Sequence, residues 1–437
     1  MLEQRLLDAH QLLESERYDE GLAAVEAILE DYPNHSGALN MAGFCWLELG
    51  KDATAFQFFQ RALQTQPDNK YVLVNSGRAL HELGKYREAL AFFLKAAEID
   101  PGYAMAYSNA AASLVQMSKW EDGRKAAELA LECDPDDMNS RMNLANCYIA
   151  MGELEKGWES FELSLGSKFR REWAYGDEER WNGEKGKTIV IYGEQGLGDE
   201  IYFMESANHA IGDSKKVYVD CDPKLEGLFK RSFPNAEVHG TRRDDAVEWL
   251  EGVEIEARCA MGSLSKFYRN NKESYPREPY LVACPERRKM WRALFDSYKK
   301  PVVGICSVGG TKKNNQSGRT VSDEKFKSLV ERYPDVVFVS LDYKGSDPGF
   351  CKAFPFAARS SDYDDTAALI AELDCVVGIC TTAMHCADAL GTPAITLVPD
   401  EHNWKFSGAI PYMKTSTVIH QNGRDWADVL KEIRLDI

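Results

Sequence analysis

The chain has 437 residues, of which 44% are hydrophobic and 28% are charged, and its net charge is −17. This composition excludes an intrinsically disordered protein, and the length predicts two or three globular domains. No apolar run is long enough to cross a bilayer. The first ten residues predict an amphipathic helix rather than a signal peptide, and the eleven scattered cysteines favour a reducing compartment, so we expect the protein to be cytoplasmic.

The negative charge is concentrated in the N-terminal part. Residues 1–165 contain 14 Lys and Arg against 27 Asp and Glu, whereas the remainder contains 38 against 42. An acidic surface repels phosphates, so nucleic acid is not expected as a ligand, while a basic or neutral polypeptide is allowed. The alternative is that the acidity only keeps an elongated surface soluble.

Four prolines (Pro33, Pro67, Pro101 and Pro135) recur at a constant spacing of 34 residues. This period is typical of tetratricopeptide (TPR) repeats, which are stacked pairs of helices. The period predicts five repeats over residues 1–165, beginning near Leu2, Ser36, Lys70, Ala104 and Met138.

The third repeat shows why the pattern fits helix pairs. Gly77 and Ala89 are small residues that let two helices approach, Gly84 supplies the turn between them, and Pro101 stops the second helix. Such a solenoid presents a groove that usually binds an extended peptide or another protein. The alternative is that the groove serves only packing or oligomerisation.

After residue 165 the period is lost, and a linker over 166–186 leads into apolar strands that alternate with helical stretches. The predicted strands are TIVIYG, KVYVDC and EIEARCA in a first group and PVVGICSV, VVFVSL, CVVGIC and AITLVP in a second. This alternation predicts parallel sheets with crossover helices. A helical segment near residue 295 separates two groups of strands. We therefore expect two doubly wound domains, over 187–288 and 289–437, with ligands beyond the carboxyl ends of the strands.

The first group of strands opens with a glycine-rich turn, Gly193-Glu194-Gln195-Gly196-Leu197-Gly198-Asp199. Its glycines let backbone N–H groups approach a ligand, and the following helix start favours negative charge. The spacing differs from the dinucleotide motif GxGxxG, so no nicotinamide site is predicted. The alternative is a tight turn in which Asp199 complements the helix dipole.

The second group carries a helix start after its strand, in Gly378-Ile379-Cys380-Thr381-Thr382-Ala383-Met384-His385. A threonine N-cap, free N–H groups and His385 in the first turn predict a cradle for a diphosphate. The alternative is an ordinary capped helix. A polar loop over 309–320 contains Lys313 and Arg319, which either close over an anion or are simply solvated.

Taken together, these segments resemble TPR-containing bacterial proteins whose catalytic region is similar to the ADP-heptosyltransferase family, which has the GT-B fold of two Rossmann-like domains. The segment GEQGLGD over 193–199 is the most specific match. The other matching segments are GWE at 157–159, WNG at 181–183, RTV at 319–321, DTAALI at 365–370 and HCADALGTP at 385–393, together with Pro399 and Trp404.

The resemblance implies a glycosyltransferase of the hexosyl or heptosyl type, without an essential metal or other cofactor. It implies that Asp199 is the base that deprotonates the acceptor, although a helix start lowers the pKa of an aspartate and so weakens it as a base. The residues expected to bind the donor are Gly196, Gly198, Lys313, Arg319, Thr381, Thr382, Ala383 and His385, with Glu194, Gln195, Asp365 and Trp404 as secondary candidates.

One position departs from the family pattern, because Cys380 stands where an aspartate is usual. The resulting Thr381-Thr382 pair is similar to the diphosphate site of O-linked N-acetylglucosamine transferases, which also join TPRs to a GT-B unit. We therefore expect a protein or a surface-glycan precursor as acceptor, a nucleotide sugar as donor, and possible oligomers. The alternative is an inactive GT-B scaffold that uses the TPR groove for assembly.

Overall fold

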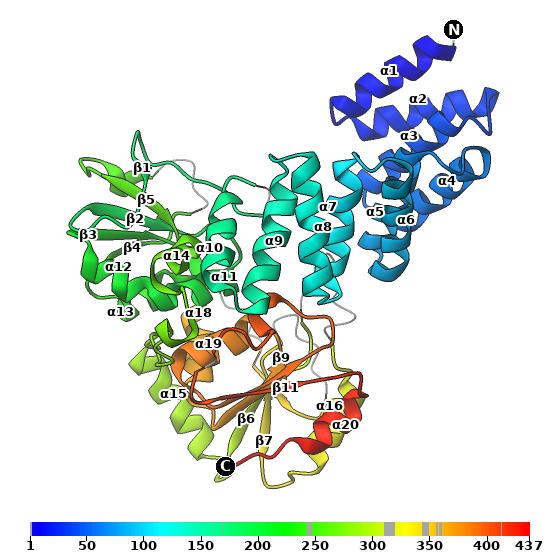
Figure 1. Cartoon of the computed structure of the whole chain (residues 1–437). Coiled ribbons are helices and arrows are strands. Elements are labelled where there is room, and N and C mark those ends of the chain that lie inside the picture. The colour runs from blue at the N-terminus through cyan, green and yellow to red at the C-terminus, as the bar shows by residue number, and fades with distance from the viewer. Residues whose placement is uncertain are drawn as a thin grey trace. The chain divides into compact units, whose positions relative to one another are not determined.

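The computed structural model describes residues 2–167, 169–242, 247–309, 320–342, 349–354, 357, 361–411 and 413–437. The chain divides into two compact units, Met1–Tyr148 and Ile149–Ile437, the first made of helices and the second of helices and sheets (Figure 1). Among the helices in the described ranges, none is both long and apolar enough to cross a membrane. All eleven cysteines are described, and all are free thiols.

The first unit is a series of helix pairs. The first helix of every pair begins at the residue that the 34-residue period predicts. The helices are α1 (Leu2–Glu14), α2 (Tyr18–Asp31), α3 (Ser36–Glu48), α4 (Asp52–Thr65), α5 (Lys70–Glu82), α6 (Tyr86–Ile99), α7 (Ala104–Gln116), α8 (Trp120–Cys133) and α9 (Met138–Met151). The last pair is completed by α10 (Leu154–Leu163), which belongs to the second unit.

The small residues of the repeats lie where the sequence predicts close approach. A Cβ atom on Gly77 would come within 2.4 Å of the Phe93 ring, and one on Gly43 within 2.5 Å of the Phe59 ring. Gly84 has a φ of +74°, as the predicted turn requires, and Ser118 takes the same left-handed conformation in the next repeat. Steric fit therefore explains the spacing of the repeat residues.

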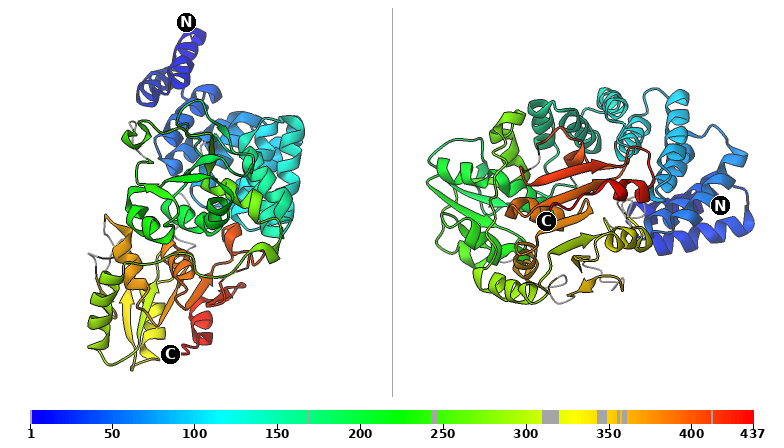
Figure 2. Two further views of the ribbon diagram at one scale, coloured as in Figure 1. Left: turned by 90° about the vertical axis from the view of Figure 1, so that its left-hand side faces the viewer. Right: turned by 90° about the horizontal axis from the view of Figure 1, so that it is seen from below.

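The second unit contains two parallel sheets, which remain separate in both views of Figure 2. The first sheet has the order β1-β5-β2-β3-β4. Its strands are β1 (Glu179–Arg180), β2 (Thr188–Tyr192), β3 (Lys216–Asp220), β4 (Glu237–His239) and β5 (Ala257–Ala260). Its helices are α11 (Leu197–Phe203), η1 (Met204–Ser206), α12 (Ala207–Asp213), η2 (Pro223–Leu225), α13 (Glu226–Ser232), η3 (Glu248–Leu250), η4 (Met261–Ser263), α14 (Leu264–Tyr268) and η5 (Lys272–Ser274). We call this sheet with α10 and its helices the first lobe.

The second sheet has the order β11-β10-β9-β6-β7-β8. Its strands are β6 (Val302–Cys306), β7 (Val337–Ser340), β8 (Lys352–Ala353), β9 (Cys375–Ile379), β10 (Ala394–Val398) and β11 (Ser416–His420). Its helices are α15 (Pro285–Asp296), α16 (Asp323–Glu331), α18 (Tyr363–Ile370), α19 (Thr382–Leu390), η7 (Trp404–Phe406) and α20 (Trp426–Glu432). We call this part the second lobe.

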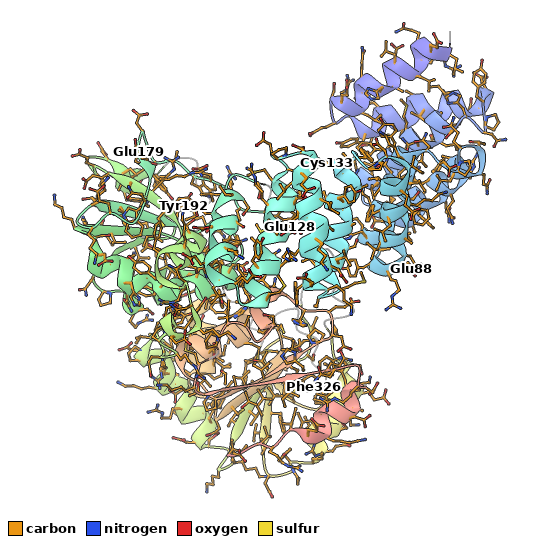
Figure 3. All side chains as sticks on the ribbon, viewed as in Figure 1. Glu88, Glu128, Cys133, Glu179, Tyr192 and Phe326 are labelled. Carbon is orange, nitrogen blue, oxygen red and sulfur yellow. The ribbon has the colours of Figure 1, made fainter. Side chains whose placement is uncertain are left out.

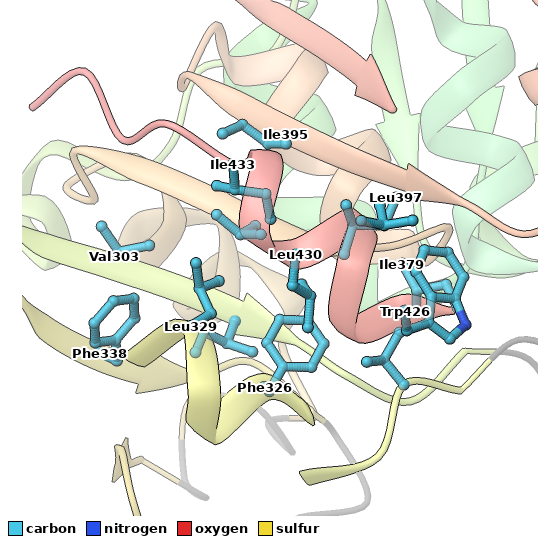
Figure 4. Packing of buried hydrophobic residues seen from close by; sticks show 14 of the residues in the cluster. Val303, Phe326, Leu329, Phe338, Ile379, Ile395, Leu397, Trp426, Leu430 and Ile433 are labelled. Carbon is cyan, nitrogen blue, oxygen red and sulfur yellow. The ribbon is translucent and has the colours of Figure 1, made fainter. Parts of the chain in front are cut away.

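One face of the second sheet is covered by α16 and α20. Figure 4 shows Phe326 and Leu329 of α16 meeting Trp426 and Leu430 of α20 over the strands. All four side chains are buried. The predicted helix near residue 295 is α15, and the predicted parallel α/β architecture is confirmed.

The path of the chain fixes where each sheet can bind a ligand. In the second sheet the chain leaves β6 toward β7 and β8, and later returns to place β9 on the other side of β6. In the first sheet the same reversal lies between β2 and β5. Ligands of open parallel sheets bind outside the carboxyl ends of the strands at such reversals. Tyr192, labelled in Figure 3, is the last residue of β2 and lies at the reversal of the first sheet.

The solenoid was predicted to extend to residue 165, whereas the division between compact units falls at Tyr148. The physical reason lies in α10, whose Trp158 packs on Phe203 of α11 and Trp404 of η7. A Cβ atom on Gly157 would come within 2.9 Å of the Ile149 backbone nitrogen, so α10 also lies tightly against the end of α9.

Candidate functional site

The candidate site lies where the first turns of α11 and α19 meet. A Cβ atom on Gly198 would come within 2.7 Å of Thr382 Oγ1, so the two helix starts are in direct contact. The helix α19 begins just beyond the carboxyl end of β9, next to the end of β6. The structure thus brings the two motifs predicted to carry the chemistry, one from each lobe, to the strand reversal of the second sheet.

The start of α19 presents polar groups at this reversal. The amides of Met384 and His385 donate to the Thr381 carbonyl, at 3.1 Å and 3.3 Å. The N–H groups of Thr382 and Ala383 precede this first intrahelical bond, so helix geometry gives them no partner within the helix. Thr381 Oγ1 is buried, and within the described residues it makes no hydrogen bond of good geometry. As predicted, Gly391 ends the helix with a φ of +75°.

Asp199, in the first turn of α11, is held from both sides. One carboxylate oxygen accepts a hydrogen bond from the Gly196 amide at 3.2 Å, and the other forms an ion pair with the ammonium of Lys405 in η7. Burial raises the pKa of Asp199, but Lys405 and His385 lower it by more, so the pKa lies below the usual value. Asp199 is therefore an ionised carboxylate and a weak base.

Aromatic rings enclose this pair. The Lys405 ammonium lies 4.6 Å from the centre of the Tyr202 ring and 5.1 Å from that of Phe203. The His385 ring stacks on Phe406 at 5.3 Å and meets Tyr202 edge-on at 5.5 Å. Lys405 is only 6% exposed, so the cation is held by the carboxylate and by ring faces rather than by water.

The structure gives Glu194 another role than donor binding. Its carboxylate is buried and accepts bonds from Arg170 and from the Gly262 amide, both at 3.1 Å. It thus joins the loop after β2 to the loop after β5, at the strand reversal of the first sheet. Burial raises the pKa of Glu194, and the Arg170 guanidinium offsets part of that rise.

The glycine-rich turn also makes contacts with other residues of the first lobe. A Cβ atom on Gly193 would come within 2.3 Å of Glu200 Oε1, so the missing side chain makes room for Glu200. Burial raises the pKa of Glu200 to about 8, although Arg242 opposes the rise. Arg242 also donates to the Gln195 carbonyl at 2.6 Å, and Gln195 donates to the Phe169 carbonyl at 3.4 Å.

Two secondary candidates, Trp404 and Asp365, contact residues away from the first turns of α11 and α19. Trp404 is buried and packs against Trp158 and Tyr202. Asp365 pairs with Arg287 of α15 at 2.9 Å.

Cys380 is buried against Val398 and Phe406, and its thiol contacts the Leu397 carbonyl at 3.6 Å. Its side chain therefore packs into the core of the second lobe. Lys313 and Arg319 lie outside the described residues.

Lys405 and Arg170, which support the candidate site, were missed in the sequence, and Trp158 was identified without its contacts. Lys405 is a single lysine between two aromatic residues, and Arg170 is one of three arginines in the linker over 166–186, so neither belongs to a pattern with a known spacing. Trp158 belongs to the GWE segment, but the sequence does not show that its indole donates to the Arg269 carbonyl at 2.9 Å, 111 positions away.

Comparisons with known proteins identify the first unit. Tetratricopeptide repeat family descriptions match residues 6–70 and 53–114. Protein FlbA of Caulobacter vibrioides is 30% identical over 248 residues, which cover 50% of this chain and 41% of FlbA. The chain thus matches less than half the length of this curated relative.

Two solved structures illustrate the similarity to known folds. A MamA fragment from Desulfovibrio magneticus RS-1 is 18% identical, with coverage of 37% of this chain and 92% of its own and a TM-score of 0.34. TTC0263, a TPR protein of Thermus thermophilus, is 20% identical, with coverage of 38% and 92% and the same TM-score. The family matches and the helix starts together confirm the predicted TPR solenoid, a fold that mediates protein–protein interaction.

Proposed function

We propose that this protein is a glycosyltransferase of the GT-B type, which transfers a sugar from a nucleotide diphosphate to a protein or surface-glycan acceptor recruited by the TPR solenoid. The observation that carries the proposal is the meeting of the α11 and α19 starts. It sets Asp199 of the first lobe against His385 of the second, at a strand reversal where ligands bind.

The start of α19 supports a diphosphate site. Backbone N–H groups at a helix start, the adjacent hydroxyls of Thr381 and Thr382 and the positive end of the helix dipole all favour an anion. In a transfer reaction these groups stabilise the charge that develops on the leaving diphosphate. Lys313 and Arg319, predicted from the sequence to add positive charge, are part of this proposal.

Asp199 is proposed to act on the acceptor. An ionised carboxylate accepts a hydrogen bond from an acceptor hydroxyl and orients it toward the sugar. Its lowered pKa makes it a weak base, so the greater share of its effect is orientation. Cys380 does not weaken the proposal, because its side chain packs into the core while backbone groups and threonines form the cradle.

The acidic solenoid supports a polypeptide partner. Residues 1–165 carry 13 more acidic than basic residues, which favours a basic or neutral segment as the recruited partner. The competing proposal, an inactive scaffold, retains the same solenoid and differs only in lacking donor chemistry.

Incubation with a panel of nucleoside-diphosphate sugars tests the proposal. We expect at least one donor to bind by calorimetry and to release its nucleoside diphosphate. Asp199→Asn is expected to retain donor binding and to lose about 10²-fold in turnover, since loss of the contact that orients the acceptor hydroxyl costs on that order. Asp428→Asn, an exposed residue of α20, is the matched control and should leave turnover unchanged. Absence of both donor binding and donor hydrolysis would favour the scaffold.

A further inference from the structure

Lys405 is a charged residue of the second lobe that contacts Asp199. It lies in η7, far along the chain from α11, and its ammonium reaches one Asp199 oxygen while the Gly196 amide reaches the other. The Asn403 side chain accepts a bond from the Lys405 amide at 3.0 Å and so fixes the start of η7. The backbone that carries the ammonium is thereby held in place.

The surroundings of Lys405 leave its ammonium little freedom. The rings of Tyr202, Phe203 and Trp404 lie within 5.5 Å of it. A lysine in such a cage interacts with ring faces along its length and with a carboxylate at its tip. Rotation of the side chain to another position would lose both kinds of contact. The cage thus fixes the ammonium, and the ammonium fixes the carboxylate.

We propose that Lys405 is a positioning residue for Asp199, which holds the carboxylate in one orientation and joins it to the second lobe. The inference rests on the proposed function only for the role it gives Asp199 in orienting the acceptor. Because α19 lies in the same lobe as Lys405, the pair would keep the acceptor-orienting group in register with the diphosphate cradle. The ligand expected beside the Lys405–Asp199 pair is therefore a nucleotide-sugar donor held at Thr381 and Thr382.

The groups that face Asp199 allow the pair to be tested by titration. Within the described residues they are Lys405 of η7, His385 of α19 and the Gly196 amide of its own turn. The pKa of Asp199 is lowered in the folded chain, so the stability that the pair contributes is present above pH about 4 and is lost as the pH falls through the folded-state pKa. Removal of a cation at contact distance is expected to raise that pKa by about 1 pH unit or more.

The test is a ¹³C NMR titration of the Asp199 carboxyl in the full chain, with its signal identified by its loss in Asp199→Asn. We expect Lys405→Met to raise the pKa of Asp199 and Lys405→Arg to keep it low. His385→Gln, which removes the weaker of the two electrostatic effects on Asp199, should shift it less than Lys405→Met. An unchanged titration in Lys405→Met, or a larger shift in His385→Gln, would overturn the proposal.

The titration measures the pKa of Asp199 whether or not the protein is an enzyme, so its outcome is independent of the proposed function. If a donor is found, the same variants give a second readout: Lys405→Met should move the acidic limb of the kcat/KM profile to higher pH, and Lys405→Arg should restore it. Loss of activity with no change in that limb would mean that Lys405 only supports the fold. Should Lys405→Met fail to fold, Lys405→Gln, which removes the charge and keeps a polar tip, is titrated in its place, and an unchanged pKa of Asp199 in that variant would overturn the proposal.

Discussion

Arg170→Met is expected to lower the free energy of unfolding of the second unit by about 3–5 kcal/mol. Arg170 is fully buried, and its guanidinium donates to Glu194, to Ser263 and to the Phe161 carbonyl while lying 3.9 Å from the centre of the Phe161 ring. Methionine fills part of the volume, but it leaves the Glu194 carboxylate in the interior without its counter-charge. Urea unfolding followed by circular dichroism measures the loss.

The pH dependence of this variant identifies the cause. Burial raises the pKa of Glu194 above its unfolded value, and loss of Arg170 raises it further. A carboxyl with a raised folded-state pKa binds more protons when folded, so stability falls as the pH rises through that range. The penalty of Arg170→Met should therefore be largest near neutral pH and shrink toward pH 5, and Glu194→Gln should remove most of this dependence. A penalty that stays constant with pH would assign the loss to packing alone.

Trp158→Ala is expected to cost the second unit about 3–5 kcal/mol. The indole is buried among Phe161, Phe203 and Trp404, with ring centres 5.6–6.3 Å away, and its N–H satisfies the Arg269 carbonyl. Alanine opens a cavity at the point where α10, α11 and η7 meet, and it also leaves a buried carbonyl without its donor.

Calorimetric unfolding of the full chain measures this effect. Trp158→Phe should retain most of the stability, because it keeps the ring contacts and loses only the hydrogen bond to the Arg269 carbonyl. Phe93→Ala is the matched control, because Phe93 is fully buried in the third repeat and its loss should destabilise the first unit instead. Equal effects of Trp158→Ala and Phe93→Ala on one shared transition would contradict the assignment of α10 to the second unit.

The repeat half could be predicted almost completely from the sequence. Gly77 and Gly43 are fixed by rings that lie against them within the same repeat, so the constraint is local and recurs at a readable spacing. The buried strands were also predicted, because continuous apolar runs such as β6 and β9 are buried along their whole length. The short strands β1, β4 and β8 and the partly exposed β11 were missed, since edge strands lack such runs.

The site could be predicted only in part. Asp199, Thr382 and His385 belong to motifs at the carboxyl ends of strands, which is where open parallel sheets bind ligands. Glu194 belongs to the first of these motifs and Trp404 is a separate match to the family pattern, but their long-range partners turn them inward, toward Arg170 and Trp158. Lys405 was missed because its role depends on a contact across 206 positions, which no local spacing indicates.

Hydrogen–deuterium exchange of the full chain, with and without ADP, GDP and UDP, tests the central claim most directly. If the α19 start is the diphosphate cradle, at least one nucleotide will slow exchange at the amides of Thr382 to His385 and in the facing turn of α11. Exchange that stays the same at both helix starts with every nucleotide, or that slows only elsewhere in the chain, would contradict it.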